Sequence, residues 1–351
     1  MIRLCDFPRI QLLVLAALLI LATPLAFSKL RDVTPITILV LSVVCLIWQA
    51  AHVVPYTPLA TKRLPDHRGD DSRVIRTAVV NLQYENPQKA AVTEQLEKLE
   101  TDLILLVEVD EAWQSALGAI YEKFPHHLGV VLEKGHGLQL ISRLPLANGQ
   151  VRYLVDDTRP SLWCVIEHEG EKINYVGLHP TPPGLPVQRD ETEMTAEKSL
   201  NRHDSRIRDA ELMIVAREVS ETEGDNEHWI VAGDFNDVAW SHTTRLFRRM
   251  SGLEDPRIGR GLYNSYHARY ALLRFPIDQI WLSRDASVAS MGRFQPVGSD
   301  HFAITTGVFF PPAGGQVTPA PEGNDHSDAA KLIEQGLEDA STLSPEQSPE
   351  E

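Results

Sequence analysis

The sequence predicts a layered α/β domain that follows a transmembrane helical hairpin. Short apolar runs typical of strands alternate with segments whose apolar residues recur at helical spacing, which indicates strands and helices in separate layers of one core. Two long apolar runs without a formal charge stand near the N-terminus and predict the hairpin. The chain has 351 residues, enough for one large domain beside such an anchor.

The N-terminal region, residues 1–55, contains apolar runs at residues 10–27 and 36–54. Each run approaches the roughly 20 residues that a helix needs to cross a bilayer. A secretory signal would explain the first run and a buried core hairpin would explain both, but the second run argues against simple secretion, and the flanking charges favour a membrane hairpin. Lysines and arginines are more numerous outside the hairpin than in its connection. This favours a multi-pass protein of the inner (cytoplasmic) membrane with its folded domain on the cytoplasmic side.

Beyond the hairpin, residues 56–72 are rich in proline and charged side chains and predict a juxtamembrane linker. Residues 73–310 carry the alternating pattern and predict the folded domain. Strands are expected at residues 73–82, 103–109, 138–142, 162–167, 173–178, 229–232, 279–283 and 302–309, and helices at residues 89–100 and 206–220. Residues 311–351 have many prolines, glycines, serines and acids and few large apolar residues, which predicts a disordered acidic tail.

The charge distribution bears on the class of partner. The formal net charge is −15, and residues 311–351 hold nine acidic residues against one lysine, so the folded part is only mildly acidic. This is not the basic surface of a protein that binds nucleic acid through its own lysines and arginines. A nuclease is not excluded, because bound divalent cations supply positive charge in another way.

Polar residues of catalytic type stand at the ends of the apolar runs. The clearest case is Gly233-Asp234-Phe235-Asn236, which ends the strand pattern at residues 229–232. Turn chemistry alone explains many such sequences, but side chains two apart on an extended segment also point the same way, so Asp234 and Asn236 are expected to face one site. The same kind of position recurs along the chain, at Asn81, Glu108, His179, Asp278, Asp300 and His301.

In order and spacing these segments resemble the endonuclease/exonuclease/phosphatase superfamily, whose fold is that of DNase I. The resemblance covers roughly residues 74–310 and is carried by residues 79–81, 102–109, 137–146, 176–179, 233–236, 276–280 and 299–301. It implies a four-layered α/β sandwich, in which two mixed sheets pack together and helices cover their outer faces. Together with the hairpin, it implies a membrane-anchored, bacterial-type member of the superfamily.

The resemblance also implies a metal site. It places the residues beside the divalent cation at Asn81, Glu108 and Asp300. Carboxylate and amide oxygens suit a hard cation, so Mg²⁺ or Mn²⁺ is expected. The remaining histidines show no metal-ligand spacing of the His-Glu-x-x-His type, and zinc is therefore not expected.

The catalytic residues implied by the resemblance are His179, Asp234, Asn236, Asp278 and His301. Asp234 and Asn236 would position the attacking water and grip the phosphate, His179 would donate to a phosphate oxygen, and His301 would contact the phosphate or the attacking water. Asp278 would orient His301, as the aspartate of a catalytic triad orients its histidine.

These expectations combine into a membrane-anchored, metal-dependent phosphoesterase in which water attacks a phosphodiester or phosphomonoester. The expected substrate is a nucleic acid or a phospholipid, and no protein partner is defined. The alternative is a catalytically silent binding or scaffold module with the same fold, tethered by the hairpin. Chemically competent residues at all the expected positions favour the enzyme.

Overall fold

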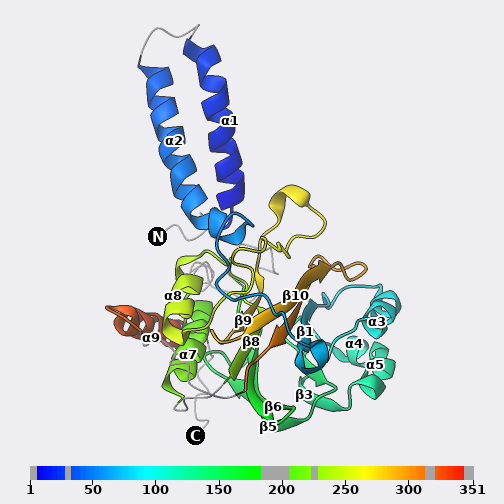
Figure 1. Cartoon of the computed structure of the whole chain (residues 1–351). Helices are drawn as coiled ribbons and strands as arrows, with labels where there is room; N and C mark the ends of the chain where they lie inside the picture. Colours follow the sequence, from blue (N-terminus) through cyan, green and yellow to red (C-terminus); the bar gives the residue numbers. More distant parts are fainter. Residues whose placement is uncertain (1–5, 28–32, 183–204, 223–227, 313–320, 344–351) are drawn as a thin grey trace, which may run out of the picture.

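Two β-sheets pack face to face, and helices cover the outer face of each sheet (Figure 1). The computed structural model describes residues 6–27, 33–182, 205–222, 228–312 and 321–343. The first sheet has six strands in the order β10-β11-β1-β2-β4-β3, and the second has five in the order β5-β6-β7-β8-β9. The four-layered α/β sandwich expected from the sequence is confirmed.

The strands are short and mostly buried. The first sheet consists of β1 (Ile75–Asn81), β2 (Leu103–Val107), β3 (His126–Val130), β4 (Leu138–Ser142), β10 (Ser287–Phe294) and β11 (Ala303–Phe309). The second consists of β5 (Leu146–Tyr153), β6 (Pro160–His168), β7 (Glu171–Leu178), β8 (His228–Asp234) and β9 (Asp278–Leu282). Every residue of β2, β8 and β9 is buried, as expected of strands covered on both faces.

The core between the sheets forms because successive strand residues point to opposite faces. Val79 and Leu105 of the first sheet and Tyr175 and Ile230 of the second belong to one buried apolar cluster between the sheets. Their neighbour Val80 points the other way and joins the cluster beneath the first sheet's helices. Those helices are α3 (Lys89–Glu97), α4 (Glu111–Ala116) and α5 (Gly118–Lys123).

The second sheet is covered by α7 (Arg206–Glu221) and α8 (His242–Ser251). Leu212 and Val215 of α7 and Phe247 of α8 pack with Val176 and Val231 of the sheet in a single buried cluster. The helices expected at residues 89–100 and 206–220 are therefore present as α3 and α7.

Strand direction brings several strand ends to one edge of the sandwich. β1 and β2 are parallel, with Asn81 opposite Val107, and β7 and β8 are parallel, with Leu178 opposite Gly233. β9 runs antiparallel to β8, so Asp278 at its start lies opposite Asp234 at the end of β8. The polar residues that follow these strands consequently meet at the same edge.

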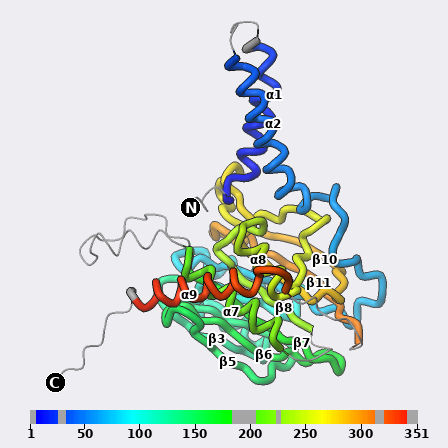
Figure 2. The backbone as a smooth tube through the Cα atoms, turned by 90° about the vertical axis from the view of Figure 1, so that its left-hand side faces the viewer, coloured from blue at the N-terminus to red at the C-terminus, as the bar shows by residue number. Residues whose placement is uncertain are grey.

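The C-terminal region differs from the expectation of a disordered tail. Asp325–Leu343 form a helix, α9, which lies against α7 and α8 on the outside of the second sheet (Figure 2). Its residues Ala329, Leu332 and Ile333 are buried in the same cluster as α7 and α8. The prediction of disorder is wrong for this helix, because its apolar residues are few but lie on one face and find a partner surface far away in the sequence.

Two helices precede the sandwich and lie side by side, α1 (Arg9–Phe27) and α2 (Thr34–Val53), the latter continued by the 3₁₀ turn η2 (Val54–Tyr56) (Figures 1 and 2). Thr34–Tyr56 is long and apolar enough to cross a membrane, whereas the apolar segment Arg9–Leu25 is shorter. Most of the exposed large apolar side chains of the described residues belong to these two helices. Length and composition are thus compatible with one membrane span near the N-terminus.

The base of the two helices is fixed to the sandwich. The Tyr56 hydroxyl donates a hydrogen bond to the Ala239 carbonyl at 2.7 Å, and the Trp240 indole donates to the Asp6 carbonyl at 2.7 Å. The segment expected as a linker packs against the domain as well, since Leu64 is fully buried. Residues 56–72 therefore hold the helices in a defined position relative to the sandwich.

Candidate active site

Five of the predicted site residues are buried and come together at the edge where the strand ends meet. Each is at most 5% exposed, and they are Asn81, His179, Asp234, Asp278 and His301. Glu108, which follows β2, and Asn236 and Asp300 are partly exposed. A buried polar cluster of this size is costly unless its members satisfy one another, so the contacts within it define what it does.

Asn81 connects two carboxylates. Its side-chain Nδ2 donates to Glu108 Oε1 and to Asp234 Oδ2, both at 3.1 Å, while its Oδ1 accepts from the backbone N–H of Gln83 at 2.9 Å. The remaining Glu108 oxygen, Oε2, accepts from the backbone N–H of Tyr84 at 3.0 Å. The amide at the end of β1 therefore sets the spacing between an acid of the first sheet and an acid of the second.

Glu108 occupies a strained position. Its φ is +68°, a left-handed conformation that residues other than glycine rarely adopt. Gly135 lies against its side chain, and a Cβ there would come within 3.3 Å of the Glu108 carboxylate. Burial raises the pKa of Glu108 against the opposing hydrogen bonds from Tyr84 and Asn81. The carboxylate is thus enclosed without a basic side chain bonded to it among the described residues.

Asp234, Asp278 and His301 form a second group, whose ligand atoms all lie within 4.8 Å of one another. His301 Nδ1 is 2.8 Å from Asp278 Oδ2, and His301 Nε2 is 3.7 Å from Asp234 Oδ2. Burial lowers the pKa of His301, but Asp278 and Asp234 outweigh it and raise this pKa to about 10. Burial, and then the charge of Asp278, raise the pKa of Asp234 to about 7.

Both groups have the side chains to hold a cation, and they differ in chemistry. A histidine that keeps its proton has no free nitrogen for a metal, so the group of Asp234, Asp278 and His301 is better suited to proton and charge chemistry. The side chains of Glu108, Asn81 and Asp300 carry carboxylate and amide oxygens, the donor types that Mg²⁺ or Mn²⁺ prefers, although the Asn81 amide here turns its NH2 group towards Glu108. By the chemistry of its donors, the Glu108 side of the cluster is therefore better suited to a hard divalent cation than the histidine-containing group.

His179 also lies beside Asp234. Its Nε2 is 3.9 Å from Asp234 Oδ2, and its Nδ1 is 3.4 Å from the guanidinium of Arg159. Burial, and then the charge of Arg159, hold the pKa of His179 well below its usual value. The two histidines beside Asp234 are thus in opposite protonation states near neutral pH, one neutral and one charged.

Asn236 and Asp300 are tied into the surrounding loops. The Asn236 backbone N–H donates to Asp234 Oδ1 at 3.0 Å, and its side-chain amide donates to the Pro180 carbonyl at 3.0 Å. The Asp300 backbone N–H donates to Gln83 Oε1 at 3.1 Å. Asn236 has a φ of +50°, a second left-handed residue at this edge.

Sequence reasoning did not single out two of the groups that face the site. Arg159 comes just before β6 and contacts His179, and the Tyr266 ring lies 4.9 Å from the His301 ring. Neither residue belongs to a polar pattern at the end of an apolar run, the sequence feature that marks the other site residues. Only the packing of distant segments places them here.

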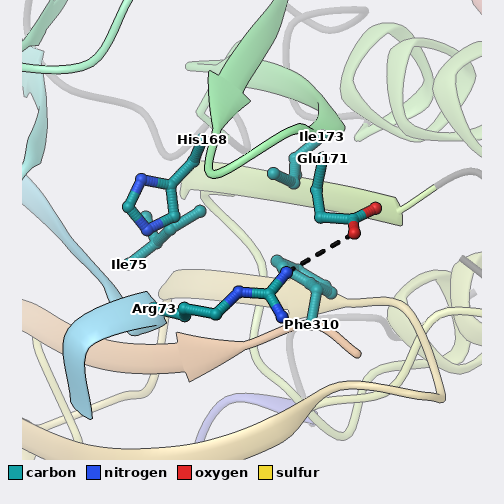
Figure 3. Close-up of a pocket in the computed structure, with 6 residues that line it drawn as sticks. All are labelled: Arg73, Ile75, His168, Glu171, Ile173 and Phe310. Atoms are coloured by element: carbon teal, nitrogen blue, oxygen red, sulfur yellow. Dashed lines mark hydrogen bonds and ion pairs between the residues drawn. The ribbon is translucent and has the colours of Figure 1, made fainter. Parts of the chain in front are cut away.

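A small hollow elsewhere is not part of this site. It is lined by Arg73, Ile75, His168, Glu171, Ile173 and Phe310 (Figure 3). Arg73 and Glu171 pair across it at 3.4 Å, and it has room for about one water molecule. Ile75 begins β1 whereas Asn81 ends it, so the hollow is at the opposite end of the strands.

Comparison with known proteins identifies the fold. Among solved structures, the human nocturnin catalytic domain with a bound sulfate anion is 17% identical, over 70% of this chain and 96% of that chain, with a TM-score of 0.50. An endonuclease/exonuclease/phosphatase from Beutenbergia cavernae is 15% identical, over 69% of this chain and 72% of that one, with a TM-score of 0.51. One from Bacteroides vulgatus is 16% identical, over 68% and 99%, with a TM-score of 0.50. At these identities the likeness concerns the fold.

No curated protein matches the chain. The sequence model described as "Endonuclease/Exonuclease/phosphatase family" matches residues 78–301, a range that begins before Asn81 and ends at His301. The match therefore includes every predicted site residue and most of the two-sheet domain, from within β1 to just before β11. This chain belongs to the endonuclease/exonuclease/phosphatase family.

Proposed function

We propose that this protein is a membrane-anchored, divalent-metal-dependent phosphoesterase that hydrolyses phosphodiester or phosphomonoester bonds with water. Members of the family are generally metal-dependent hydrolases of phosphoester bonds. The observation that carries the proposal is the position of Asn81, whose amide bonds both Glu108 and Asp234. It joins an oxygen-rich site for a cation to a buried acid that lies between two histidines.

Asn81, Glu108 and Asp300 would hold Mg²⁺ or Mn²⁺. When bound, the cation would neutralise charge that develops on the phosphoryl and leaving oxygens. The Asn81 amide keeps its Oδ1 oriented through the Gln83 backbone N–H, and Tyr84 fixes one oxygen of Glu108. These contacts hold the donor atoms in place before a substrate arrives.

Asp234 is our candidate for the group that takes a proton from the attacking water. With a pKa near 7, it is matched to proton transfer at neutral pH, where a general base is most effective. Its Oδ1 is bonded by the backbone N–H of Asn236 and its Oδ2 by the amide of Asn81. The second side-chain N–H of Asn236 would remain for a phosphate oxygen.

The two histidines would contact the phosphate in different ways. His301, protonated and oriented by Asp278, would place a positive N–H donor at Nε2 beside the phosphoryl oxygens. His179 is neutral because of burial and Arg159, and it would donate a neutral hydrogen bond. Asp278 is a positioning residue, since it acts through His301.

The N-terminal helices would anchor the enzyme. We propose that α1 and α2 form the membrane hairpin, with the catalytic domain on the cytoplasmic side in accordance with the distribution of lysine and arginine. Their exposed leucines and valines support this assignment, since a soluble protein rarely exposes so large an apolar surface.

The test is hydrolysis by the purified full-length chain in detergent, with Mg²⁺, with Mn²⁺ or with chelator. The substrates are plasmid DNA, RNA, phospholipid and the soluble diester bis(p-nitrophenyl) phosphate. We expect metal-dependent turnover that is lost in both Asp234→Ala and His301→Ala. The matched control is His228→Ala, because His228 also pairs with an aspartate, Asp285, at 3.1 Å but lies away from the site. Wild-type turnover no faster than that of the two site variants on every substrate would refute the proposal.

A further inference from the structure

A loop beside the candidate active site reaches the base of the N-terminal helices. Residues 266–275 connect the region after α8 to β9 and include the 3₁₀ turn η4 (Ala271–Leu273). The loop projects from the sandwich on the side of α1 and α2, in yellow in Figures 1 and 2. Its position relative to both the helices and the site is fixed by specific contacts.

Towards the helices, the loop contacts the first turn of α1. The Gln11 side chain donates a hydrogen bond to the Leu272 carbonyl at 2.6 Å. The rings of Phe7 and Phe275 meet edge to face with their centroids 5.5 Å apart. The uncharged apolar run of α1 begins at Ile10, so Leu272 lies level with the first apolar turn of that helix.

The tip of the loop is apolar and exposed. Leu272 is 83% exposed, and Tyr270 and Leu273 are more than half exposed. Exposing several apolar side chains to water at one tip is energetically unfavourable. Such a patch indicates contact with a partner surface or a membrane. Here the exposed apolar surface continues onto α1, whose leucines are exposed as well.

The charge of the loop is suited to a lipid surface. Residues 266–275 include Arg269 and Arg274 and no acidic residue. Tyrosine and arginine beside exposed leucines are typical of segments at the boundary between lipid head groups and acyl chains. Two positive charges near an anionic bilayer favour the same position.

Towards the site, the loop bonds to the residues that carry the chemistry. Tyr266 packs against the His301 ring, and the Ala268 backbone N–H donates to the Asp300 carbonyl at 2.6 Å. Arg269 donates to Gln83 Oε1 at 2.9 Å, and that oxygen also accepts from the Asp300 N–H. Only a few residues of the loop therefore separate its exposed tip at Leu272 from the residues that contact the candidate site.

We propose that residues 270–273 contact the bilayer crossed by the N-terminal helices, and that the active site takes the head-group phosphodiester of a phospholipid. The proposal rests on the phosphoesterase function proposed above and narrows its substrate class. The loop would place the rim of the site level with the first turn of α1, which is where the lipid head groups would lie. A phosphodiester in that layer is reached without leaving the membrane.

The reaction would be simple hydrolysis. A water oxygen forms a new bond to phosphorus and one ester P–O bond breaks. The water gives up one proton to the base, and the leaving alcohol oxygen takes up one proton. The products are a phosphomonoester and an alcohol, and no oxidant or reductant is needed.

Contact with lipid is tested by fluorescence quenching. Full-length chain, with Cys5, Cys45 and Cys164 replaced by alanine, receives an environment-sensitive label at Leu272→Cys and is reconstituted in vesicles of phosphatidylethanolamine and phosphatidylglycerol. Lipids brominated on the acyl chains should quench this label. The control label is at Leu337→Cys, an exposed leucine of α9. Equal quenching at the two positions would overturn the contact with lipid. That result is expected if the tip binds a protein partner instead of the bilayer.

The substrate class is tested in the same vesicles. In the double variant Leu272→Asp with Leu273→Asp we expect phospholipid hydrolysis, measured by phosphorus NMR, to fall about tenfold or more, because two leucines that would contact the lipid are replaced by charged side chains. The double variant should hydrolyse soluble bis(p-nitrophenyl) phosphate at the wild-type rate. The control variant Leu337→Asp should hydrolyse both substrates at the wild-type rate.

The outcomes separate this inference from the phosphoesterase proposal. If wild type cleaves the soluble diester faster than Asp234→Ala but leaves phospholipid intact, the lipid substrate is wrong and the phosphoesterase stands. If wild type is no faster than Asp234→Ala on either substrate, the phosphoesterase proposal fails, and the quenching result alone decides whether the loop contacts lipid. Equal phospholipid turnover in wild type and the double variant would also overturn the role of the loop.

Discussion

His301 Nδ1 lies 2.8 Å from Asp278 Oδ2, and Asp278 is fully buried at the start of β9. Burial would favour the neutral imidazole, but Asp278 and Asp234 outweigh it and raise the pKa of His301 to about 10. The imidazolium therefore donates from Nδ1 to Asp278 and directs Nε2 towards Asp234, which is 3.7 Å away. Asp278 thus orients the ring, and Asp278 and Asp234 together keep it charged.

The first prediction follows from this pair. Asp278→Asn should leave the fold intact and reduce turnover on the order of a thousandfold, because an amide does not stabilise the charged ring and favours the wrong orientation. The pH profile of turnover should also move to lower pH, as His301 loses its proton more easily. The measurement is turnover of a soluble phosphodiester against pH. Asp285→Asn, in the pair with His228, is the control and should match wild type; an unchanged rate in Asp278→Asn would contradict the assigned role.

The second prediction concerns the cation. Glu108→Gln should raise the Mg²⁺ concentration needed for half-maximal turnover by more than about tenfold, since it removes the formal charge of the expected metal ligand. Calorimetric titration of the full-length chain with Mn²⁺ provides a readout that is independent of activity. Glu171→Gln serves as the matched control, because Glu171 pairs with Arg73 at the other end of the strands. Mn²⁺ affinity equal to that of wild type would place the cation elsewhere.

The third prediction uses a buried acid on α7. Burial raises the pKa of Glu211 to about 8, opposed by Arg159 and assisted by Asp156, and neither of its oxygens has a hydrogen-bond partner among the described residues. Its pKa in the unfolded chain is about 4.3. Between those values the folded state binds a proton that the unfolded state releases, so this group's contribution to stability falls as pH rises through that window.

Glu211→Gln should remove this fall. Between about pH 4.3 and pH 8, the free energy of unfolding of wild type should fall by on the order of a few kcal/mol relative to that of the variant. Thermal unfolding in detergent across that pH range measures the difference. Glu218→Gln on the same helix is the control, because Glu218 is paired with Arg152 at 2.6 Å and partly exposed. A parallel pH dependence in wild type and Glu211→Gln would show that Glu211 ionises normally.

The fourth prediction concerns α9. Ile333→Ala should destabilise the domain by about 2 to 4 kcal/mol, because it leaves a cavity in the cluster shared by α7, α8 and α9. Lys331→Ala, on the exposed side of the same helix, should change the stability by less than about 0.5 kcal/mol. Thermal unfolding of the two variants checks this, and equal stability would mean that α9 does not contribute to the core.

Much of the sandwich could be predicted from local pattern. β2 is an unbroken apolar run, β8 contains the apolar run of residues 229–232, and α7 has helical periodicity, so each is recognisable within its own residues. The polar residues at the strand ends could be found in the same way, because Asn81, Glu108 and Asp234 interrupt those runs. Their convergence needed the family resemblance, since it depends on which strands are parallel.

The tail and the loop show where pattern fails. The composition of the tail, acidic and poor in apolar residues, predicts disorder, but Leu332 and Ile333 are buried on one face of α9. Arg159 and Tyr266 lie beside His179 and His301 without any local signal in the sequence. Each of these contacts joins segments that are far apart along the chain.

The sequence by itself determined the strand-forming runs, the apolar N-terminal segments and the chemistry available at the strand ends, because these depend on residues close together in the chain. Only the tertiary structure decided that Asn81 joins Glu108 to Asp234, that Asp278 orients His301, and that the loop of Leu272 meets Gln11 of α1. The physical reason is that hydrogen bonding and desolvation act on atoms a few ångströms apart, whatever their separation in sequence.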